Sequence, residues 1–426
     1  MSPVLPFEIT TLIIDVVGEN EDTDLLKELA LVSHSFLQIC SKHIFATIEL
    51  GDAYAYSSRS NRGFVKLLKS RPEVVKYIRK LRYNVFHNLP RFVDDRDCFI
   101  SSILPNFLRS IPHLSCLIII SGSIVTMDWK KLDSSLTSAL LHLMHLPTIN
   151  RIDLSSIENF PLSSLIPCVN LLRLDVFLMS PDDDSFEIVP SEMMPKLRDF
   201  RTARSSLLTR KLSHVKMQDG RPAFNPINLR RLSFGAEKLE DNSKIRFLVQ
   251  NAKLLEGLRL PNGLGQSMVG LHDILSPIAC TLKVLHLTSS FSFRHGFDVS
   301  TPVRQLCEEL EAMAGHNVLE ALCYTITIGS SENTEGDADD FIETIIQKVG
   351  GVLVKPGWSA LRLVFFTVFR RAWTDRENLE ALQSLTDKCL SHISKLDSDS
   401  ESVQIAFRCV RSSDYLDYIS PVICRF

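Results

Sequence analysis

A short apolar pattern recurs along most of this chain and restricts the folds that it can adopt. In the pattern L-x-x-L-x-L, the first, fourth and sixth residues are apolar or aromatic, and Thr202 is the one exception. The ten copies begin at Ile78, Leu114, Ile149, Leu171, Leu197, Leu229, Leu255, Leu282, Leu319 and Leu361. Because 45% of the chain is hydrophobic, such triplets also arise by chance, so their spacing is the stronger evidence.

The spacing indicates a repeated structural unit. Successive first positions are 36, 35, 22, 26, 32, 26, 27, 37 and 42 residues apart, and four of these steps fit the about 20–29 residues of a leucine-rich repeat. Turn-rich or acidic insertions near Asp183, Gly220 and Gly336 read as solvent loops that lengthen other steps. Helix-compatible pieces such as "TPVRQLCEELEAMAGH" lie between triplets. We therefore predict an α/β fold in which a short strand and a helix alternate as a solenoid.

The first 50 residues are apolar in a different way. Three helices are predicted: one with Ile9, Leu12, Ile13 and Val16, one with Leu25, Leu26, Leu29 and Val32, and one with Phe36, Ile39, Cys40, Ile44 and Phe45. Pro6 fits the first turn of the first helix, and Thr23 and Ser33 are the expected N-caps of the other two. Helices this short cannot bury so many large side chains among themselves. We expect a partner, or the rest of the chain, to cover the remainder.

The residues of this segment resemble the F-box. The similarity lies in L-P-x-E-I-x-x-x-I-I from Leu5, then "LALVSHSF", then "HIFATIEL", with Phe45 where many members have Trp. The resemblance implies docking onto the Skp-type adaptor of SCF (Skp, cullin, F-box) ubiquitin ligases, while the rest of the chain selects a protein substrate. Carried over to this sequence, the adaptor-binding residues are Leu5, Pro6, Ile9, Ile13, Val32 and Phe45. Some of them are expected to pack in the core of the three-helix unit instead.

The repeats resemble the degenerate leucine-rich repeats that follow fungal F-boxes. They depart from the regular type because no Asn or Cys stands at position eight after a leading residue. Four parts are predicted: an F-box over 1–50, linker helices over 51–77, an irregular leucine-rich-repeat-like α/β solenoid over 78–372, and a capping segment over 373–426. In the linker, Pro72 is expected to open a helix whose apolar face includes Val75, Ile78 and Leu81. In the last part, "VQIAFRCV" reads as a final strand.

Composition argues against nucleic acid, membrane and secretion. The chain has 47 basic and 50 acidic residues, so no long-range field favours nucleic acid or an acidic bilayer. Its ten cysteines are scattered without C-x-x-C spacing, which is typical of reduced, buried thiols in a cytosolic or nuclear protein. The N-terminus lacks a cationic region, and the apolar runs are far shorter than the about 20 residues of a membrane span.

The usual motifs of catalysis and cofactor binding are missing. We find no phosphate loop, H-E-x-x-H helix, EF-hand loop or G-x-S-x-G elbow. His142 and His145 lie three residues apart, but no third ligand is near in the sequence, so packing or surface placement is the default for them. The sequence therefore predicts no metal, no cofactor and no catalytic residue.

A basic cluster is the one local charge excess. It comprises Lys196, Arg198, Arg201, Arg204, Arg210, Lys211 and Lys216. A solvated surface explains it, and the alternative is that Arg198, Arg201, Arg204, Arg210 and Lys211 bind an acidic or phosphorylated segment of the substrate.

Together these features predict a substrate-recognition subunit of an SCF-type ubiquitin ligase, without catalytic residues of its own. It would bind the adaptor and, through it, cullin. The alternative is a leucine-rich-repeat scaffold that binds proteins without ligase activity.

Overall fold

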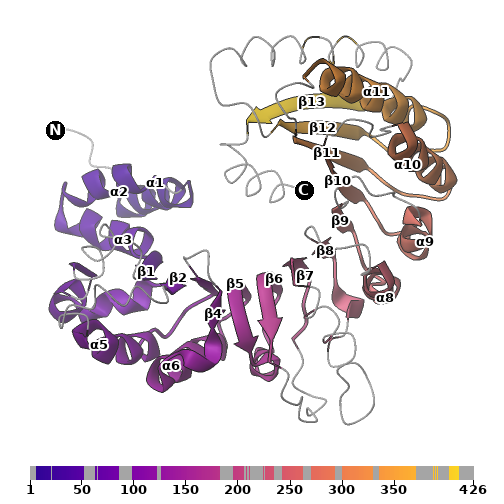
Figure 1. Cartoon of the computed structure of the whole chain (residues 1–426). Helices are drawn as coiled ribbons and strands as arrows, with labels where there is room; N and C mark the ends of the chain where they lie inside the picture. The colour runs from indigo at the N-terminus through magenta and orange to yellow at the C-terminus, as the bar shows by residue number, and fades with distance from the viewer. Residues whose placement is uncertain are drawn as a thin grey trace, which may run out of the picture. The chain divides into compact units, whose positions relative to one another are not determined.

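The chain is an α/β protein whose described strands are all parallel (Figure 1). The computed structural model describes residues 6–20, 22–51, 63–64, 66–85, 98–121, 126–182, 195–205, 208, 211, 224, 226–234, 242–261, 270–292, 300–329, 335–370, 387, 389, 391 and 403–411. Two compact units divide the chain: unit 1 contains residues 1–197 and 214–224, and unit 2 contains residues 198–213 and 225–426.

Unit 1 begins with three helices and continues as a sheet. The helices are α1 (Phe7–Glu19), α2 (Thr23–Ala30), α3 (His34–Ile44), α5 (Cys98–Arg109) and α6 (Ser134–Met144), with 3-10 turns η1 (Pro72–Tyr77), η2 (Trp129–Lys131) and η3 (Leu162–Leu165). The strands are β1 (Thr47–Gly51), β2 (Lys80–Val85), β3 (Cys116–Ser121), β4 (Met127–Asp128), β5 (Arg151–Phe160) and β6 (Arg173–Pro181). Their order in the sheet is β1-β2-β3-β5-β6, and β4 pairs with β5.

Unit 2 repeats the alternation of strand and helix. Its strands, which pair in sequence order, are β7 (Asp199–Ala203), β8 (Arg231–Phe234), β9 (Gly257–Pro261), β10 (Val284–Ser292), β11 (Ala321–Gly329), β12 (Leu363–Arg370) and β13 (Gln404–Arg411). Its helices are α8 (Asn242–Asn251), α9 (Leu271–Leu275), α10 (Ser300–Met313) and α11 (Glu335–Leu353), with 3-10 turns η4 (Pro226–Asn228) and η6 (Ser276–Ile278). Within the unit, α8, α9, α10 and α11 lie on the same side of the strands (Figure 1).

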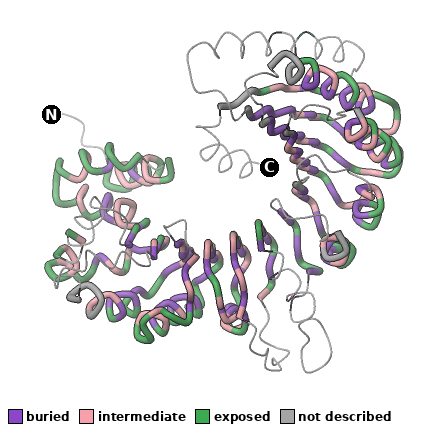
Figure 2. The backbone as a smooth tube through the Cα atoms, in the orientation of Figure 1, coloured by how far each residue is buried: buried purple, intermediate pink, exposed green. Residues whose placement is uncertain are grey.

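The predicted triplets form the buried face of these strands; Figure 2 shows buried residues along the strands, alternating with less buried ones in β5 and β6. Every triplet position, Thr202 included, is at most 6% exposed. The fourth residue of each triplet is paired in register with the fourth residue of the triplet on the neighbouring strand. In unit 1 this row contains Leu81, Leu117, Ile152 and Leu174. In unit 2 it contains Phe200, Leu232, Leu258, Leu285, Leu322 and Val364. The strands predicted at the triplets are therefore confirmed.

A shared backbone hydrogen-bond pattern fixes where each strand begins. The carbonyl of the second triplet residue accepts two successive N–H groups from the next repeat: Arg79 O accepts from Ser115 N (2.7 Å) and Cys116 N (3.0 Å), and Arg230 O accepts from Glu256 N (2.8 Å) and Gly257 N (2.9 Å). The same arrangement recurs at Ser115, Asn150, Arg198, Glu256, Lys283 and Glu320. The strands of repeats that differ in length stay in register, because the carbonyl of the second triplet residue makes the same two hydrogen bonds in each repeat.

The pattern also extends to β1, which the ten triplets do not include. Ala46 O accepts from Arg79 N (2.9 Å) and Lys80 N (2.8 Å), and Ile48 and Leu50 are buried. Phe45, Ile48 and Leu50 thus have the spacing of an eleventh triplet, and β1 pairs with β2 in parallel.

Several local predictions are wrong. Asp22, not Thr23, caps α2, because its side chain accepts from Leu25 N at 3.1 Å. The segment that begins at Pro72 is the 3-10 turn η1 and not the longer helix expected. It ends at Tyr77, and Leu81, which was predicted to lie on that helix, belongs to β2. The loop expected near Gly336 is instead the start of helix α11, which begins at Glu335.

Other predictions hold or fall outside the described residues. Ser33 caps α3, and the final strand is β13, paired with β12. The insertions at 183–194 and 212–223, and most of 373–426, lie outside the described residues. Seven described cysteines are free, of which four are buried and Cys280 is exposed. In the described part of the chain, no helix has both the length and the hydropathy that crossing a bilayer requires.

Candidate functional site

The N-terminal helices present large apolar side chains to solvent. On α1, four of them form a stripe: Ile9, Leu12, Ile13 and Val16 are each 43–60% exposed. We call these four residues the apolar stripe. Phe7 and Leu25 are also exposed, and at the turn between α2 and α3 Leu31 is 87% and Val32 67% exposed. Exposed apolar residues concentrated on one small unit are typical of an interaction surface.

The opposite side of α1 is already occupied by its own core. Ile14 is 1% exposed and packs with Leu26, Ile39 and Cys40, and Val17, Leu29, Ala30, Phe36 and Ile44 complete this cluster. α1 is therefore apolar on both faces, whereas a surface helix normally presents polar residues to water. Its buried face accounts for the packing of the three helices and leaves the apolar stripe without a cover among the described residues.

An ionic contact fixes the orientation of α1. Asp15 on α1 accepts from His43 Nε2 at 2.6 Å and from Lys42 Nζ at 2.7 Å, both on α3. Hydrogen bonds from Lys42 and then from His43 lower the pKa of Asp15. Gly18 is needed beside this contact, because a Cβ there would lie 2.2 Å from Nδ1 of His43. The contact holds α1 so that the apolar stripe points away from α3.

The residues predicted to bind an adaptor have different environments. Pro6, Ile9, Ile13 and Val32 are exposed, and Leu5 lies outside the described residues. Phe45 is the C-cap residue of α3, is half-buried and leads the eleventh triplet, so its position indicates packing. Five further exposed residues were not predicted to bind, although Leu12 and Val16 share the periodicity of Ile9 and Ile13; the five are Phe7, Leu12, Val16, Leu25 and Leu31.

The five residues of the basic cluster that were predicted to bind substrate belong to unit 2, whereas Lys196 and Lys216 belong to unit 1. Arg198 precedes β7, Arg201 lies within it and Arg204 follows it, while Lys211 lies farther along and Arg210 is outside the described residues. Strand pairing places Arg201 beside Ser233 and Ser233 beside Arg259. The sequence-local cluster therefore includes only part of the positive charge on these strands, and Arg231 and Arg259 were not predicted.

A second charged group, in unit 1, is internally paired. Arg151 donates to Asp153 from Nε (2.9 Å) and Nη2 (2.6 Å), and Arg173 donates to Asp175 from Nε (3.0 Å) and Nη2 (2.7 Å). A further contact of 3.3 Å joins Arg151 to Asp175. Burial raises the pKa of Asp153 despite its bond to Arg151. These side chains link the neighbouring strands β5 and β6, and because the two arginines are matched by two aspartates they present no excess charge to a ligand.

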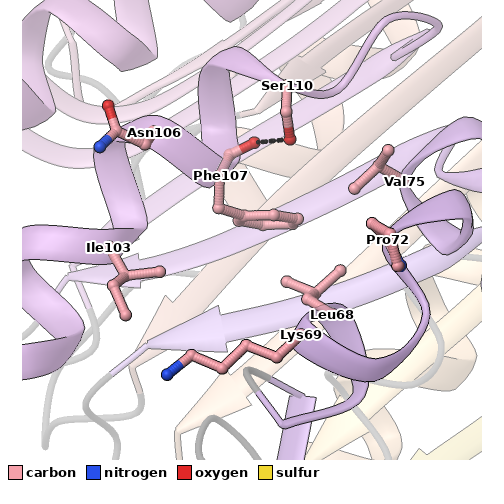
Figure 3. Close-up of a pocket in the computed structure, with 8 residues that line it drawn as sticks. All are labelled: Leu68, Lys69, Pro72, Val75, Ile103, Asn106, Phe107 and Ser110. Carbon is pink, nitrogen blue, oxygen red and sulfur yellow. Dashed lines mark hydrogen bonds between the residues drawn. The ribbon is translucent and has the colours of Figure 1, made fainter.

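One pocket of about 340 Å³ lies on unit 1 (Figure 3). It is lined by Leu68, Lys69, Pro72, Val75, Ile103, Asn106, Phe107 and Ser110. Ser110 donates to the carbonyl oxygen of Phe107 at 2.6 Å, and no histidine or carboxylate lines the pocket to activate it. The lining is suited to packing against apolar groups and offers no set of residues for catalysis.

Metal ligands do not gather anywhere in the part of the chain that the structure describes. His145 Nε2 instead lies 2.9 Å from the carbonyl oxygen of Ser164. In the comparisons with known proteins, no protein-family model and no curated protein matches this chain.

Proposed function

We propose that this chain is the substrate-recognition subunit of an SCF-type ubiquitin ligase in the cytosol or nucleus. Its N-terminal helices bind the Skp-type adaptor, which links them to cullin, and its strands and helices bind a protein target. The observation that carries this proposal is the apolar stripe, which is exposed on a helix whose other face is buried. Burial of apolar surface is favourable by about 25 cal/mol per Å². A partner that covers the apolar stripe would therefore gain binding free energy from it.

The sheet units serve as the target-binding part in this proposal. In-register triplets, repeat steps of 22 to 42 residues and a shared carbonyl position support an irregular leucine-rich-repeat-like solenoid. A subunit of this kind needs no acid, base or nucleophile. It accelerates ubiquitin transfer by holding the target near the conjugating enzyme, which raises their effective concentration.

A co-purification experiment tests the adaptor contact. The full chain is mixed with the Skp-type adaptor and cullin, and the wild type is expected to capture both. Ile9→Glu with Ile13→Glu places two charges in the apolar stripe and abolishes capture while the fold is retained. Val169→Glu is the matched control, because Val169 is a similarly exposed apolar residue (42%) elsewhere in unit 1. Failure of the wild type to bind the adaptor overturns the proposal.

The second candidate is a protein-binding scaffold without ligase activity. The same exposed stripe supports it, since any apolar partner would cover these residues. Capture of the adaptor without cullin, or without ubiquitin transfer to any bound protein, favours the scaffold. Capture of both with transfer favours the ligase subunit.

A further inference from the structure

Three arginines that are far apart in the sequence lie on adjacent strands of unit 2. Residues alternate between two faces of a strand, and the triplets take the buried face, so Arg201, Arg231 and Arg259 share the other face. Arg201, Ser233 and Arg259 form one row across β7, β8 and β9, and Arg231 lies two residues before Ser233. With strands about 4.8 Å apart and a rise of about 3.3 Å per residue, the three Cα atoms are about 8–10 Å from one another. We call these residues the arginine cluster.

Positive charge dominates this face. Among the described positions on it in β7, β8 and β9, Asp199 is the one acidic residue against three arginines. Its carboxylate lies 4.0 Å from Nε of Arg231, which is longer than a hydrogen bond. Gly257 pairs with Arg231 in register and adds no side chain beside it. A guanidinium has five N–H donors, so each arginine can keep an existing partner and still donate to a ligand.

The charges are spread across the strands instead of converging on one point. Arg231 has Asp199 of β7 as its charged neighbour, at 4.0 Å. Arg259 instead neighbours β10, where burial and then the charge of Arg259 lower the pKa of His286 to about 3. His286 is paired in register with Arg259, and its Nε2 lies 2.7 Å from Oγ1 of Thr325. A single phosphate is usually held by guanidinium groups that meet around it, whereas separated charges suit several separated carboxylates.

We propose that the arginine cluster binds an extended segment of the target that is rich in Asp and Glu. The inference rests on the proposed function, since a substrate receptor needs a surface for its target, and it names the chemistry of that target. Alternate side chains of an extended segment are about 6.6 Å apart, a distance that long arginine side chains can match from Cα atoms about 8–10 Å apart. Charge complementarity of this kind mainly determines specificity and association rate.

Peptide binding to the full chain tests the proposal. Fluorescence anisotropy compares four probes: a short Glu-rich peptide, its Gln counterpart, a peptide with one phosphoserine among neutral residues, and an RNA oligonucleotide of similar charge. The Glu-rich peptide is expected to bind tightest, with an affinity that falls as salt is added. Arg231→Gln with Arg259→Gln weakens it about tenfold or more, because two charge-assisted contacts are lost. Arg362→Gln is the matched control: this arginine is exposed in the same unit but precedes β12.

The peptide-binding results test the arginine cluster independently of adaptor binding. Equal binding of the Glu-rich and Gln peptides, or an unchanged affinity in the double variant, overturns it. Tighter binding of the phosphopeptide replaces the acidic segment with a phosphate site, and tighter binding of an RNA oligonucleotide of similar charge rejects a protein target. Thermal melts of each variant establish that the fold is intact. Adaptor capture by the double variant is expected to stay unchanged, so the two failures are distinguishable.

Discussion

Asp15 and His43 join the first and third helices of the N-terminal unit, with Oδ1 of the aspartate 2.6 Å from Nε2 of the histidine. Lys42 reaches the same oxygen at 2.7 Å. This contact lies on the flank of α1, between its buried face and the exposed apolar stripe. The orientation of the docking surface therefore depends on a polar contact that pH and mutation can alter.

Asp15→Asn is expected to destabilise the helical unit by about 1 kcal/mol at neutral pH, because a partly exposed ion pair contributes little more. The pKa of Asp15 is lowered in the folded state, so its carboxylate stabilises the fold above the unfolded value of about 4. That contribution is lost as the pH falls through the folded pKa. Urea unfolding at neutral and acidic pH should show a difference between wild type and variant that disappears in acid.

Asp24→Asn provides the control for this measurement. Asp24 also pairs with a lysine, Lys27, at 2.9 Å, but both residues lie on α2 and are exposed. Its loss should leave unfolding and adaptor binding unchanged. An equal effect of both variants would show that the contact between α1 and α3 has no special role.

Gly18→Ala tests the same junction by steric means. The new Cβ would lie 2.2 Å from Nδ1 of His43, so the ring must move away from Asp15. We expect a loss of about 1–3 kcal/mol, as in other overpacked sites, measured by thermal or urea unfolding. Gly351→Ala is the control, because a Cβ there meets nothing within 4 Å and alanine favours helix α11 by up to about 1 kcal/mol.

Binding and packing should separate within the N-terminal unit. Leu12→Ser and Val16→Ser remove exposed apolar groups from the stripe, so each is expected to weaken adaptor binding about tenfold with little change in stability. Phe45→Ala removes the half-buried leader of a triplet and is expected to cost about 2–4 kcal/mol of stability. Calorimetric binding and urea unfolding on the same variants check both. A stable Phe45→Ala protein with lost binding would assign Phe45 to the interface.

The sequence predicted the strands well because their signal is local. Leu258 and Leu260 alternate with Gly257 and Arg259, so a period of two is readable without any neighbour. β1 was missed because its triplet, Phe45, Ile48 and Leu50, overlaps a segment that also continues a helical pattern. Choosing between the two requires knowledge of the pairing with β2, which sequence spacing does not contain.

The candidate site was predictable in part for a similar reason. The exposure of Ile9 and Ile13 could be predicted because α1 carries apolar residues on more than one face, and only one face can pack against the other helices. The arginine cluster was not predictable, because Arg201, Arg231 and Arg259 are about 30 residues apart and meet only through register. Residues close together in sequence, such as Arg198 and Arg204, therefore predicted positive charge at β7 but not on β8 and β9.

Thr202 is the one polar residue in the triplets, and its replacement tests whether the pattern is a packing rule. The side chain is 2% exposed, and its Oγ1 has no hydrogen-bond partner. A buried, unsatisfied hydroxyl costs about 1–3 kcal/mol, so Thr202→Val should stabilise the protein by about 1 kcal/mol. Thr325→Val is the matched control, since its Oγ1 lies 2.7 Å from His286 Nε2 and the same change should destabilise. Thermal unfolding of both variants decides the point, and a lower melting temperature for Thr202→Val would mean that the hydroxyl is required at this triplet position.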